Sequence, residues 1–171
     1  MPLIQRQDEI HLVFTKRTSH MRSHSAEIAF PGGGREQDDL TLVDTALRET
    51  REELVHPDDF QWTTIGSCAP VPSIRGVPVT SVLAVHTAPL LGSLENVFPG
   101  CPNEVERVFS VSLEALLEVE TTKPFGRLGT PAPVFIVEGE EIWGLTAFIL
   151  QPLLHKVLVP VFLDGAANKI K

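Results

Sequence analysis

The stretch that decides the fold of this chain runs from Gly33 to His56 and reads GGREQDDLTLVDTALRETREELVH. Its glycines continue the segment Pro31-Gly32-Gly33-Gly34, in which a proline and three glycines interrupt any regular element. A backbone without side chains can approach a phosphate chain closely. We therefore expect a loop at this point that is suited to holding an anionic ligand.

The residues after this loop predict an amphipathic helix from Leu40 to Leu54. Asp38 and Asp39 occupy positions that favour a helix N-cap, and Pro57 marks the end of the pattern. The apolar side of the helix repeats at about 100° per residue. Its members are Val43, Ala46, Leu47, Thr50 and Leu54.

Beside the apolar side, the helix carries three glutamates, Glu49, Glu52 and Glu53, at spacing i, i+3, i+4. Residues at this spacing are neighbours on a helix, and adjacent carboxylates repel each other unless a cation lies among them. Mg²⁺ prefers such oxygen ligands. Arg48 lies one turn before Glu52 and is expected to hold one carboxylate in position by a charge-assisted hydrogen bond. A solvated charged face is the alternative, and the preceding glycine loop favours the metal site over it.

Composition limits the remaining choices. The chain has 171 residues, of which 43% are hydrophobic and 21% charged, as in a globular protein with a core. Its formal net charge of −8 argues against wide contact with nucleic acid. No apolar run reaches the length of a membrane span, and we expect no membrane partner. Two cysteines, without a metal-binding spacing, favour a reducing, cytoplasmic location.

The rest of the chain alternates between predicted strands and helices. Strands are expected at His11–Thr15, Trp62–Ile65, Val77–His86 and Val134–Val137, and a hairpin turn at Glu138–Glu141. Helices are expected at Ser110–Glu118, with Ser112 as N-cap, and at Thr146–Val159, where Pro152 requires a kink or a break. This order suits an α/β fold in which helices cover both faces of a mixed β-sheet. We expect a single domain over residues 1–165 and a short C-terminal tail over residues 166–171.

The stretch from Gly33 to His56 resembles the Nudix box, G-x(5)-E-x(7)-R-E-U-x-E-E-x-G-U, in which U is apolar. The core Arg48-Glu49-x-x-Glu52-Glu53 is intact. Upstream, Asp39 replaces the first Glu of the pattern, and eight residues rather than seven separate it from Arg48. Val55 replaces the late Gly.

These departures resemble the coenzyme A pyrophosphatase branch of the superfamily. That branch carries Asp with a one-residue insertion and the upstream pattern L-L-T-x-R-S-x(2)-L-R-x(3)-G-x(3)-F-P-G-G. Here Thr15, Arg17, Arg22 and the segment Phe30–Gly33 match by identity. Ala26 replaces the Gly of the pattern, and it would hinder function if that position needs a positive φ or close approach to the nucleotide.

The resemblance implies a Nudix fold and an enzyme that uses Mg²⁺ or Mn²⁺ to hydrolyse the pyrophosphate of coenzyme A or acyl-CoA. The products would be 4′-phosphopantetheine and adenosine 3′,5′-bisphosphate. It implies Glu49 and Glu53 as metal ligands, and Glu52 as a third ligand or the general base. Glu104 is the other candidate base, and Arg48 completes the catalytic set. The expected substrate-binding residues are Arg17, Arg22, Gly32, Gly33 and Arg75.

Several alternatives stay open at this stage. The chain could be a Nudix hydrolase of another nucleoside diphosphate derivative, such as ADP-ribose, NADH or a dNTP, and Ala26 favours that alternative. It could also be a catalytically weak nucleotide-binding protein. The resemblance implies a further strand before the position of Leu12, so either this chain is a short form that lacks an N-terminal strand, or Pro2-Leu3-Ile4 is the remnant of a lost strand. A homodimer is a further expectation.

Overall fold

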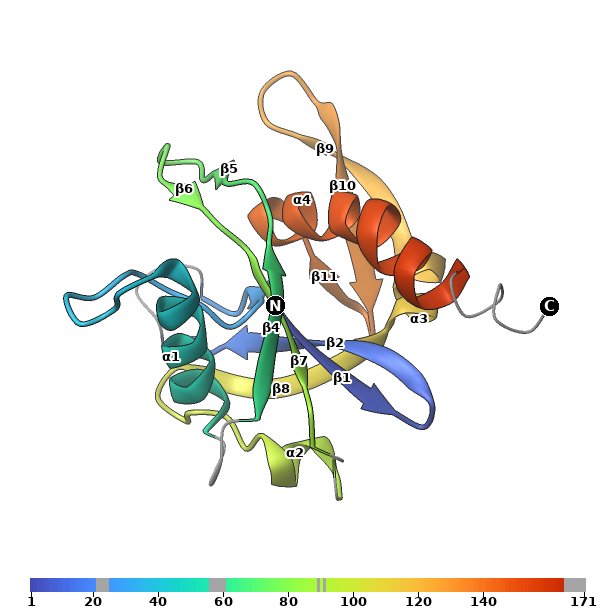
Figure 1. The fold of residues 1–171 in the computed structure, drawn as a ribbon. Coiled ribbons are helices and arrows are strands. Elements are labelled where there is room, and N and C mark those ends of the chain that lie inside the picture. The colour runs from blue at the N-terminus through green and yellow to red at the C-terminus, as the bar shows by residue number, and fades with distance from the viewer. Residues whose placement is uncertain (21–24, 56–60, 89, 91, 165–171) are drawn as a thin grey trace. The chain divides into compact units, whose positions relative to one another are not determined.

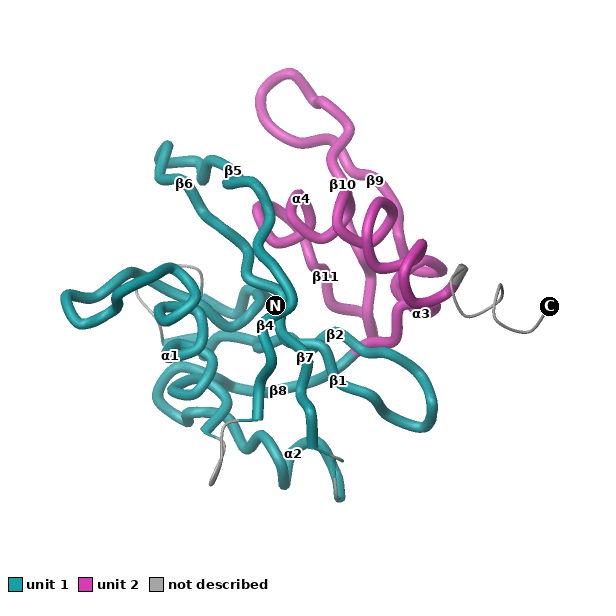
Figure 2. The backbone as a smooth tube through the Cα atoms, viewed as in Figure 1, with its two compact units in different colours: residues 1–110 teal, residues 111–171 magenta. Residues whose placement is uncertain are grey.

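A computed structural model describes residues 1–20, 25–55, 61–88, 90 and 92–164 of the chain, and its elements are drawn in Figure 1. The chain folds into two compact units, Met1–Ser110 and Val111–Lys171, which Figure 2 shows in different colours. The predicted single domain over residues 1–165 stays a prediction. The predicted tail over residues 166–171 lies outside the described residues.

Unit 1 is built on a mixed sheet in the order β3-β2-β1-β7-β4, with β8 also pairing with β2. Strand β1 runs antiparallel to β2 and parallel to β7, which makes the sheet mixed as predicted. The strands of this sheet are β1 (Pro2–Arg6), β2 (Glu9–Arg17), β3 (Ile28–Ala29), β4 (Trp62–Ser67), β7 (Val82–His86) and β8 (Val105–Ser112). A separate two-stranded ribbon is formed by β5 (Val71–Pro72) and β6 (Pro78–Val79).

The N-terminal segment differs from the expectation of a lost strand. Pro2–Arg6 forms a complete strand that is paired on both sides, with Leu3 opposite Leu12 of β2 and next to Val85 of β7. Leu3, Ile4 and Leu12 are all fully buried. The short apolar run at the start of the sequence is therefore part of the core rather than a remnant.

Helix α1 (Leu42–Leu54) confirms the predicted helix, with a start two residues later than expected. Its N-cap is Thr41, whose hydroxyl accepts a hydrogen bond from the Asp44 N–H, while the Asp44 side chain accepts from the Thr41 N–H. The predicted caps at Asp38 and Asp39 are therefore wrong. Pro57 lies outside the described residues, and the helix ends before it at Val55, which adopts the left-handed conformation.

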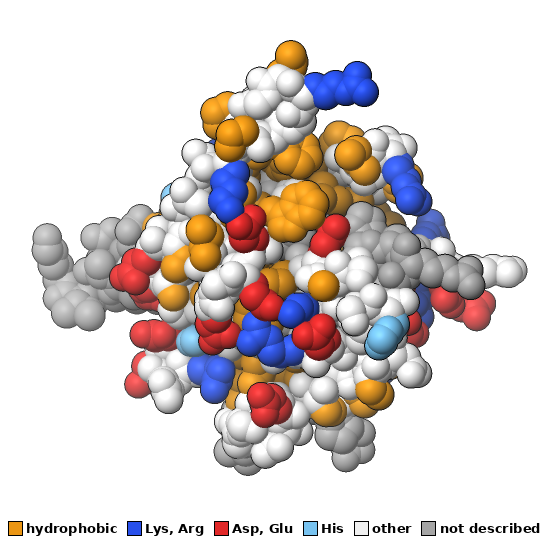
Figure 3. Space-filling model, turned by 180° about the vertical axis from the view of Figure 1, so that it is seen from behind, with side chains coloured by type: hydrophobic (Ala, Val, Ile, Leu, Met, Phe, Trp, Pro, Cys, Tyr) orange, Lys and Arg blue, Asp and Glu red, His pale blue; other side chains and the backbone are white. Residues whose placement is uncertain are grey.

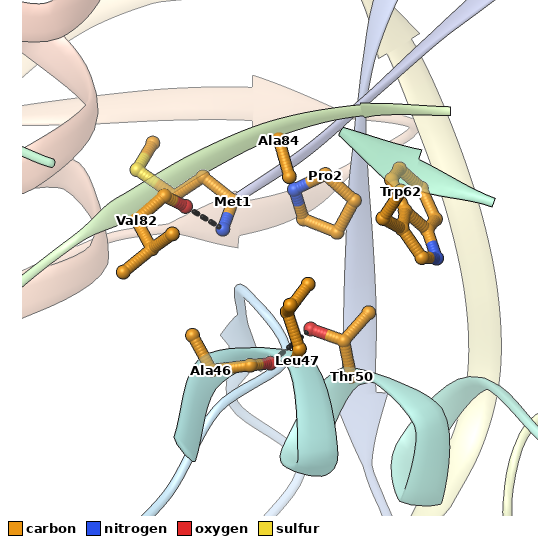
Figure 4. Close-up of a pocket in the computed structure, with 8 residues that line it drawn as sticks. All are labelled: Met1, Pro2, Ala46, Leu47, Thr50, Trp62, Val82 and Ala84. Atoms are coloured by element: carbon orange, nitrogen blue, oxygen red, sulfur yellow. Dashed lines mark hydrogen bonds between the residues drawn. The ribbon is translucent and has the colours of Figure 1, made fainter. Parts of the chain in front are cut away.

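Helix α1 packs against the sheet through its predicted apolar side, as Figure 4 shows from within unit 1. The facing residues line one small pocket: Ala46, Leu47 and Thr50 from the helix and Met1, Pro2, Trp62, Val82 and Ala84 from the strands. At the end of the helix, Leu54 is fully buried in a core cluster with Ile4, Val13, Phe98 and Val105. Full burial of a leucine stabilises the fold by about 1.5–3 kcal/mol, so this cluster anchors the C-terminal turn of α1.

Unit 2 consists of helices around a three-stranded antiparallel sheet in the order β11-β10-β9. Its strands are β9 (Glu120–Phe125), β10 (Thr130–Val137) and β11 (Glu140–Ile142). The hairpin predicted at Glu138–Glu141 is confirmed, with its turn at Glu138-Gly139 and the next two residues in β11. Its helices are α3 (Leu113–Val119), α4 (Gly144–Leu153) and the π-helix η1 (Leu154–Asp164), while the short α2 (Leu94–Val97) belongs to unit 1. Ser112 caps α3 as predicted, because its hydroxyl accepts from the Ala115 N–H.

Pro152 does not break the last helix. Helix α4 continues past it, and the chain changes to π-helical geometry at Leu154. The segment Gly144–Leu163 is long and apolar enough to cross a membrane by length and composition, although the sequence predicted no such run. A core helix of a soluble protein passes the same test, so one such helix is only a weak indication.

Candidate functional site

The glycine loop, the acidic side of α1 and the end of β2 meet in unit 1 and form the candidate site. Arg48 lies at its centre and donates to both oxygens of Asp39, from Nε to Oδ1 at 3.1 Å and from Nη2 to Oδ2 at 3.0 Å. Its Nη2 also donates to the Gly34 carbonyl at 2.8 Å. A bidentate pair of this kind fixes the guanidinium plane, so Asp39 and Gly34 orient Arg48.

The remaining amino group of the Arg48 guanidinium donates hydrogen bonds to two of the three glutamates. Nη1 donates to Glu49 Oε1 at 3.1 Å and to Glu52 Oε2 at 3.2 Å. Hydrogen bonds from Arg48 hold the pKa of Asp39 well below its usual range. Arg48 therefore links the loop to the acidic side of the helix, as the sequence led us to expect for one carboxylate.

Glu53 lies deeper than its neighbours, with only 4% of its surface exposed. Thr15 Oγ1 on β2 donates to Glu53 Oε2 at 3.1 Å, and Arg17 Nη1 lies 3.7 Å from Glu53 Oε1. The Gly32 N–H also donates to this carboxylate. Burial raises the pKa of Glu53 to about 7, although the bonds from Thr15 and Gly32 and the charge of Arg17 act in the opposite direction.

Glu49 is tied to the loop by close packing. A Cβ added at Gly33 would lie only 2.4 Å from Glu49 Oε1, so a larger residue at this position would displace the Glu49 carboxylate. Burial raises the pKa of Glu49 against the opposing hydrogen bond and charge of Arg48, and the charges of Glu52 and Glu104 raise it further. Glu104, in the turn before β8, therefore lies within electrostatic range of Glu49.

The structure thus brings together most residues that the sequence singled out. Those that meet at the end of β2, the loop and α1 are Arg17, Gly32, Gly33, Arg48, Glu49, Glu52, Glu53 and Glu104. Arg75 is exposed in the turn between β5 and β6, and no hydrogen bond or ion pair among the described residues joins it to this group. Arg22 lies outside the described residues. Figure 3 shows one face of the molecule on which basic side chains lie among acidic ones.

Two contributors were not assigned a site role from sequence. Thr15 was noted only as a match to the upstream pattern, and its contact with Glu53 joins residues 38 positions apart. The local pattern predicts Asp39 as a helix cap, whereas the structure has it buried and paired with Arg48. The offset of Asp39 in the box was the available signal, because the pattern places an acid at this point of the chain.

The donor chemistry of the site suits a hard divalent cation, since Glu49, Glu52 and Glu53 offer carboxylate oxygens. Burial and like charge raise the pKa of Glu49, which indicates that a further positive charge there would be favourable. Within the described ranges, no three His, Cys, Asp or Glu side chains are grouped closely enough to hold a metal ion. A cation shared by these glutamates therefore requires at least one side chain to move, and Glu49 and Glu52 are less buried than Glu53.

Comparison with known proteins places the chain among enzymes of one kind. The family model described as NUDIX domain matches residues 1–129. The protein named Uncharacterized Nudix hydrolase NudL from Yersinia pestis (strain Pestoides F) is 33% identical over 163 residues, covering 93% of this chain and 78% of that protein. NudL from Yersinia pseudotuberculosis serotype O:1b (strain IP 31758) gives the same values.

The chain was also compared with solved structures. The Nudix hydrolase RenU from M. Smegmatis has a TM-score of 0.47 at 17% identity, covering 69% of this chain and 70% of that one. The NUDIX domain of Shewanella oneidensis NrtR, in complex with ADP ribose, has a TM-score of 0.43 at 16% identity, covering 68% and 71%.

Proposed function

This chain belongs to the Nudix hydrolase family, and we propose that its substrate is coenzyme A or an acyl-CoA. As a Nudix hydrolase it acts on a phosphorus-containing anhydride of a nucleotide derivative. Cleavage of the pyrophosphate of coenzyme A would release 4′-phosphopantetheine and adenosine 3′,5′-bisphosphate. The substrate assignment rests on the upstream pattern from Thr15 to Gly33 and on the offset of Asp39.

The structural observation that supports a phosphate-bearing substrate is the environment of the Arg17 guanidinium. Its Nη1 lies 3.7 Å from Glu53, while its buried Nε has no hydrogen-bond partner among the described residues. An unsatisfied buried donor is costly, and a phosphate oxygen is the acceptor that a guanidinium binds best. We assign Arg17 to the substrate phosphates, together with Arg22, which lies outside the described residues. Arg75 is proposed as a further contact from its exposed turn.

Nudix hydrolases generally use divalent metal ions, and we propose Mg²⁺ or Mn²⁺ here, held by Glu49, Glu53 and Glu52. When bound, the ion would neutralise phosphate charge and make a bound water more acidic. Arg48 keeps Glu49 and Glu52 oriented toward the loop. We assign Gly32 and Gly33 to the substrate as well, because Gly32 has no side chain and open space beside it, and Gly33 leaves room for the Glu49 carboxylate at the loop. Glu52 and Glu104 are the two candidates for the general base, which accepts the proton of the attacking water.

A second candidate substrate is another nucleoside diphosphate derivative, such as ADP-ribose, NADH or a dNTP. Ala26 is the observation that favours it. Its φ is +57°, in the left-handed region that a glycine adopts at no steric cost, so this chain departs from the coenzyme A pattern where the backbone needs a glycine. A nucleotide-binding protein with weak catalysis is the third candidate. We also propose a cytoplasmic location and a homodimer.

One substrate panel separates these candidates. The purified protein is incubated with coenzyme A, acetyl-CoA, ADP-ribose, NADH and dNTPs, each with Mg²⁺ or Mn²⁺, and the products are resolved by chromatography. We expect coenzyme A or acetyl-CoA to give adenosine 3′,5′-bisphosphate faster than any other substrate is cleaved. Cleavage of ADP-ribose without cleavage of coenzyme A would overturn the substrate assignment. Binding without turnover of any diphosphate would support the third candidate.

A further inference from the structure

One carboxylate of the candidate site, that of Glu53, is held by a strand as well as by its own helix. Thr15 and Arg17 are two residues apart on β2, so their side chains leave the same face of the strand. Thr15 approaches Glu53 Oε2 and Arg17 approaches Glu53 Oε1, so each oxygen has its own partner. The 3.1 Å contact of Thr15 is a hydrogen bond, while the 3.7 Å contact of Arg17 is an ion pair without one.

The hydroxyl of Thr15 has two acceptors within reach. Glu53 Oε2 lies at 3.1 Å and the Ala29 carbonyl oxygen at 3.5 Å. A hydroxyl carries a single proton, and the contact at 3.1 Å is within ordinary hydrogen-bond range, whereas the one at 3.5 Å is at its limit. Thr15 is only 1% exposed, so water does not compete for this bond. Its proton is therefore directed at Glu53.

The backbone on both sides of this contact is fixed. Thr15 pairs with Ala29 in the β2–β3 ladder, and the Glu53 carbonyl accepts from the Cys101 N–H at 2.9 Å. Leu54, the next residue, is buried in the core cluster. The hydrogen bond therefore joins two side chains whose backbones are each held by contacts of their own.

We propose that Thr15 is a positioning residue, whose buried hydroxyl holds the Glu53 carboxylate in the orientation that pyrophosphate hydrolysis requires. The inference rests on the proposed function in one respect, the use of Glu53 as a metal ligand. A carboxylate that is buried but free to rotate would present its oxygens in several directions, and catalysis is sensitive to such displacement. The Gly32 N–H assists Thr15 from the loop.

The test compares Thr15→Val, which nearly keeps the side-chain shape but removes the hydroxyl, with Thr15→Ser, which keeps the hydroxyl. Thr50→Val is the matched control, because Thr50 is also buried but its hydroxyl donates to the Ala46 carbonyl of its own helix. Three quantities are measured for each protein: kcat and KM for hydrolysis of coenzyme A, the affinity for Mn²⁺ by calorimetry without substrate, and the midpoint of thermal unfolding.

For Thr15→Val we expect kcat to fall about ten- to a hundredfold, as when a hydrogen bond to a charged group is lost, with KM changed by less than about threefold. The affinity for Mn²⁺ should weaken in parallel. Thr15→Ser should recover most of both losses, and Thr50→Val should keep the values of the parent protein.

The proposal is overturned if Thr15→Val keeps the kcat and Mn²⁺ affinity of the parent protein, or if Thr15→Ser is as impaired as Thr15→Val while both are folded. If Thr15→Val does not fold, Thr15→Ala takes its place in the same comparison. Failure of the proposed function is distinguishable, because it shows as absent coenzyme A hydrolysis by the parent protein. The Mn²⁺ affinities of the Thr15 variants are measured without substrate and still decide the role of Thr15.

Discussion

The two ends of helix α1 differ in whether a glycine stands at the position where the backbone or its surroundings favour one. At the N-terminal side, the loop keeps a glycine where a side chain would collide with Glu49, and Arg48 ties that loop to Asp39 and Gly34. At the C-terminal side, Val55 occupies a left-handed conformation with φ +50° and ψ +55°, where a glycine is the usual residue. For a β-branched residue, such a conformation is an outlier.

The difference indicates at which positions a change of residue affects the reaction and at which it affects only stability. A residue larger than glycine at position 33 would displace a carboxylate of the candidate site, so its cost falls on function. Val55 is 42% exposed and contacts no residue of the candidate site by hydrogen bond or ion pair among the described residues, so its cost of about 1–2 kcal/mol falls on stability alone. A protein tolerates the second kind of cost more readily as long as its overall stability stays sufficient.

The largest expected effect is on activity and comes from Gly33→Ala. The new Cβ would meet the carboxylate of Glu49, which is the flexible end of a side chain and can move aside. The fold should therefore survive, while displacement of the carboxylate by about an ångström lowers kcat/KM for diphosphate hydrolysis roughly a hundredfold.

Gly34→Ala is the control for this prediction, because a Cβ at Gly34 meets nothing within 4 Å. It should retain most of the activity, and both variants should show the unfolding midpoint of the parent protein within a few degrees. Equal activity of the two variants would show that the close contact between position 33 and Glu49 has no role in the reaction.

Local sequence patterns predicted α1, α3 and α4 of this protein, but neither the short α2 nor the change to π-helical geometry at Leu154. The spacing of apolar residues predicted α1 to its last residue, and Ser112 predicted the start of α3 because both signals act within one turn. The N-cap of α1 was predicted wrongly at Asp38 and Asp39. The carboxylate of Asp39 accepts a hydrogen bond from Arg48, nine residues later in the chain. A capping rule considers only partners within the first helical turn and therefore cannot predict this contact.

The contacts that complete the candidate site lie outside such patterns. Thr15 meets Glu53 because β2 runs beside the end of α1, which is a property of the folded sheet. The family pattern did mark two backbone positions correctly. Ala26 and Val55 replace its glycines, and both have a positive φ in the structure.

The second prediction uses pH to separate the two ends of the helix. The pKa of Asp39 is held below its usual range by Arg48, so its charged form stabilises the folded state above the ordinary aspartate pKa. This contribution is fully present at neutral pH and is lost progressively as the pH falls below about 4. Asp39→Asn should therefore unfold at a lower temperature than the parent protein at pH 7, and the gap should narrow as the pH falls from about 4 to about 2.

Thermal unfolding followed by circular dichroism at several pH values measures this gap. Asp38→Asn is the control, because Asp38 is its exposed neighbour, and it should change the midpoint much less at every pH. A gap between Asp39→Asn and the parent protein that stays constant from pH 7 to pH 2 would contradict a stabilising role for the charge of Asp39.

The smallest expected effect lies at the C-terminal end. Val55→Gly removes the steric cost of the left-handed conformation, about 1–2 kcal/mol, and adds about 0.5–1 kcal/mol of backbone entropy to the unfolded chain. The net expectation is a gain of about 1 kcal/mol in the free energy of unfolding, measured by urea denaturation. Since no charge is involved, the gain should be the same at pH 7 and pH 2, unlike the effect of Asp39→Asn, which narrows over that range. Val77→Gly is the control, because Val77 is an exposed valine without a positive φ, and it should not increase the free energy of unfolding. An equal increase in both variants would show that backbone strain at Val55 is not the cause.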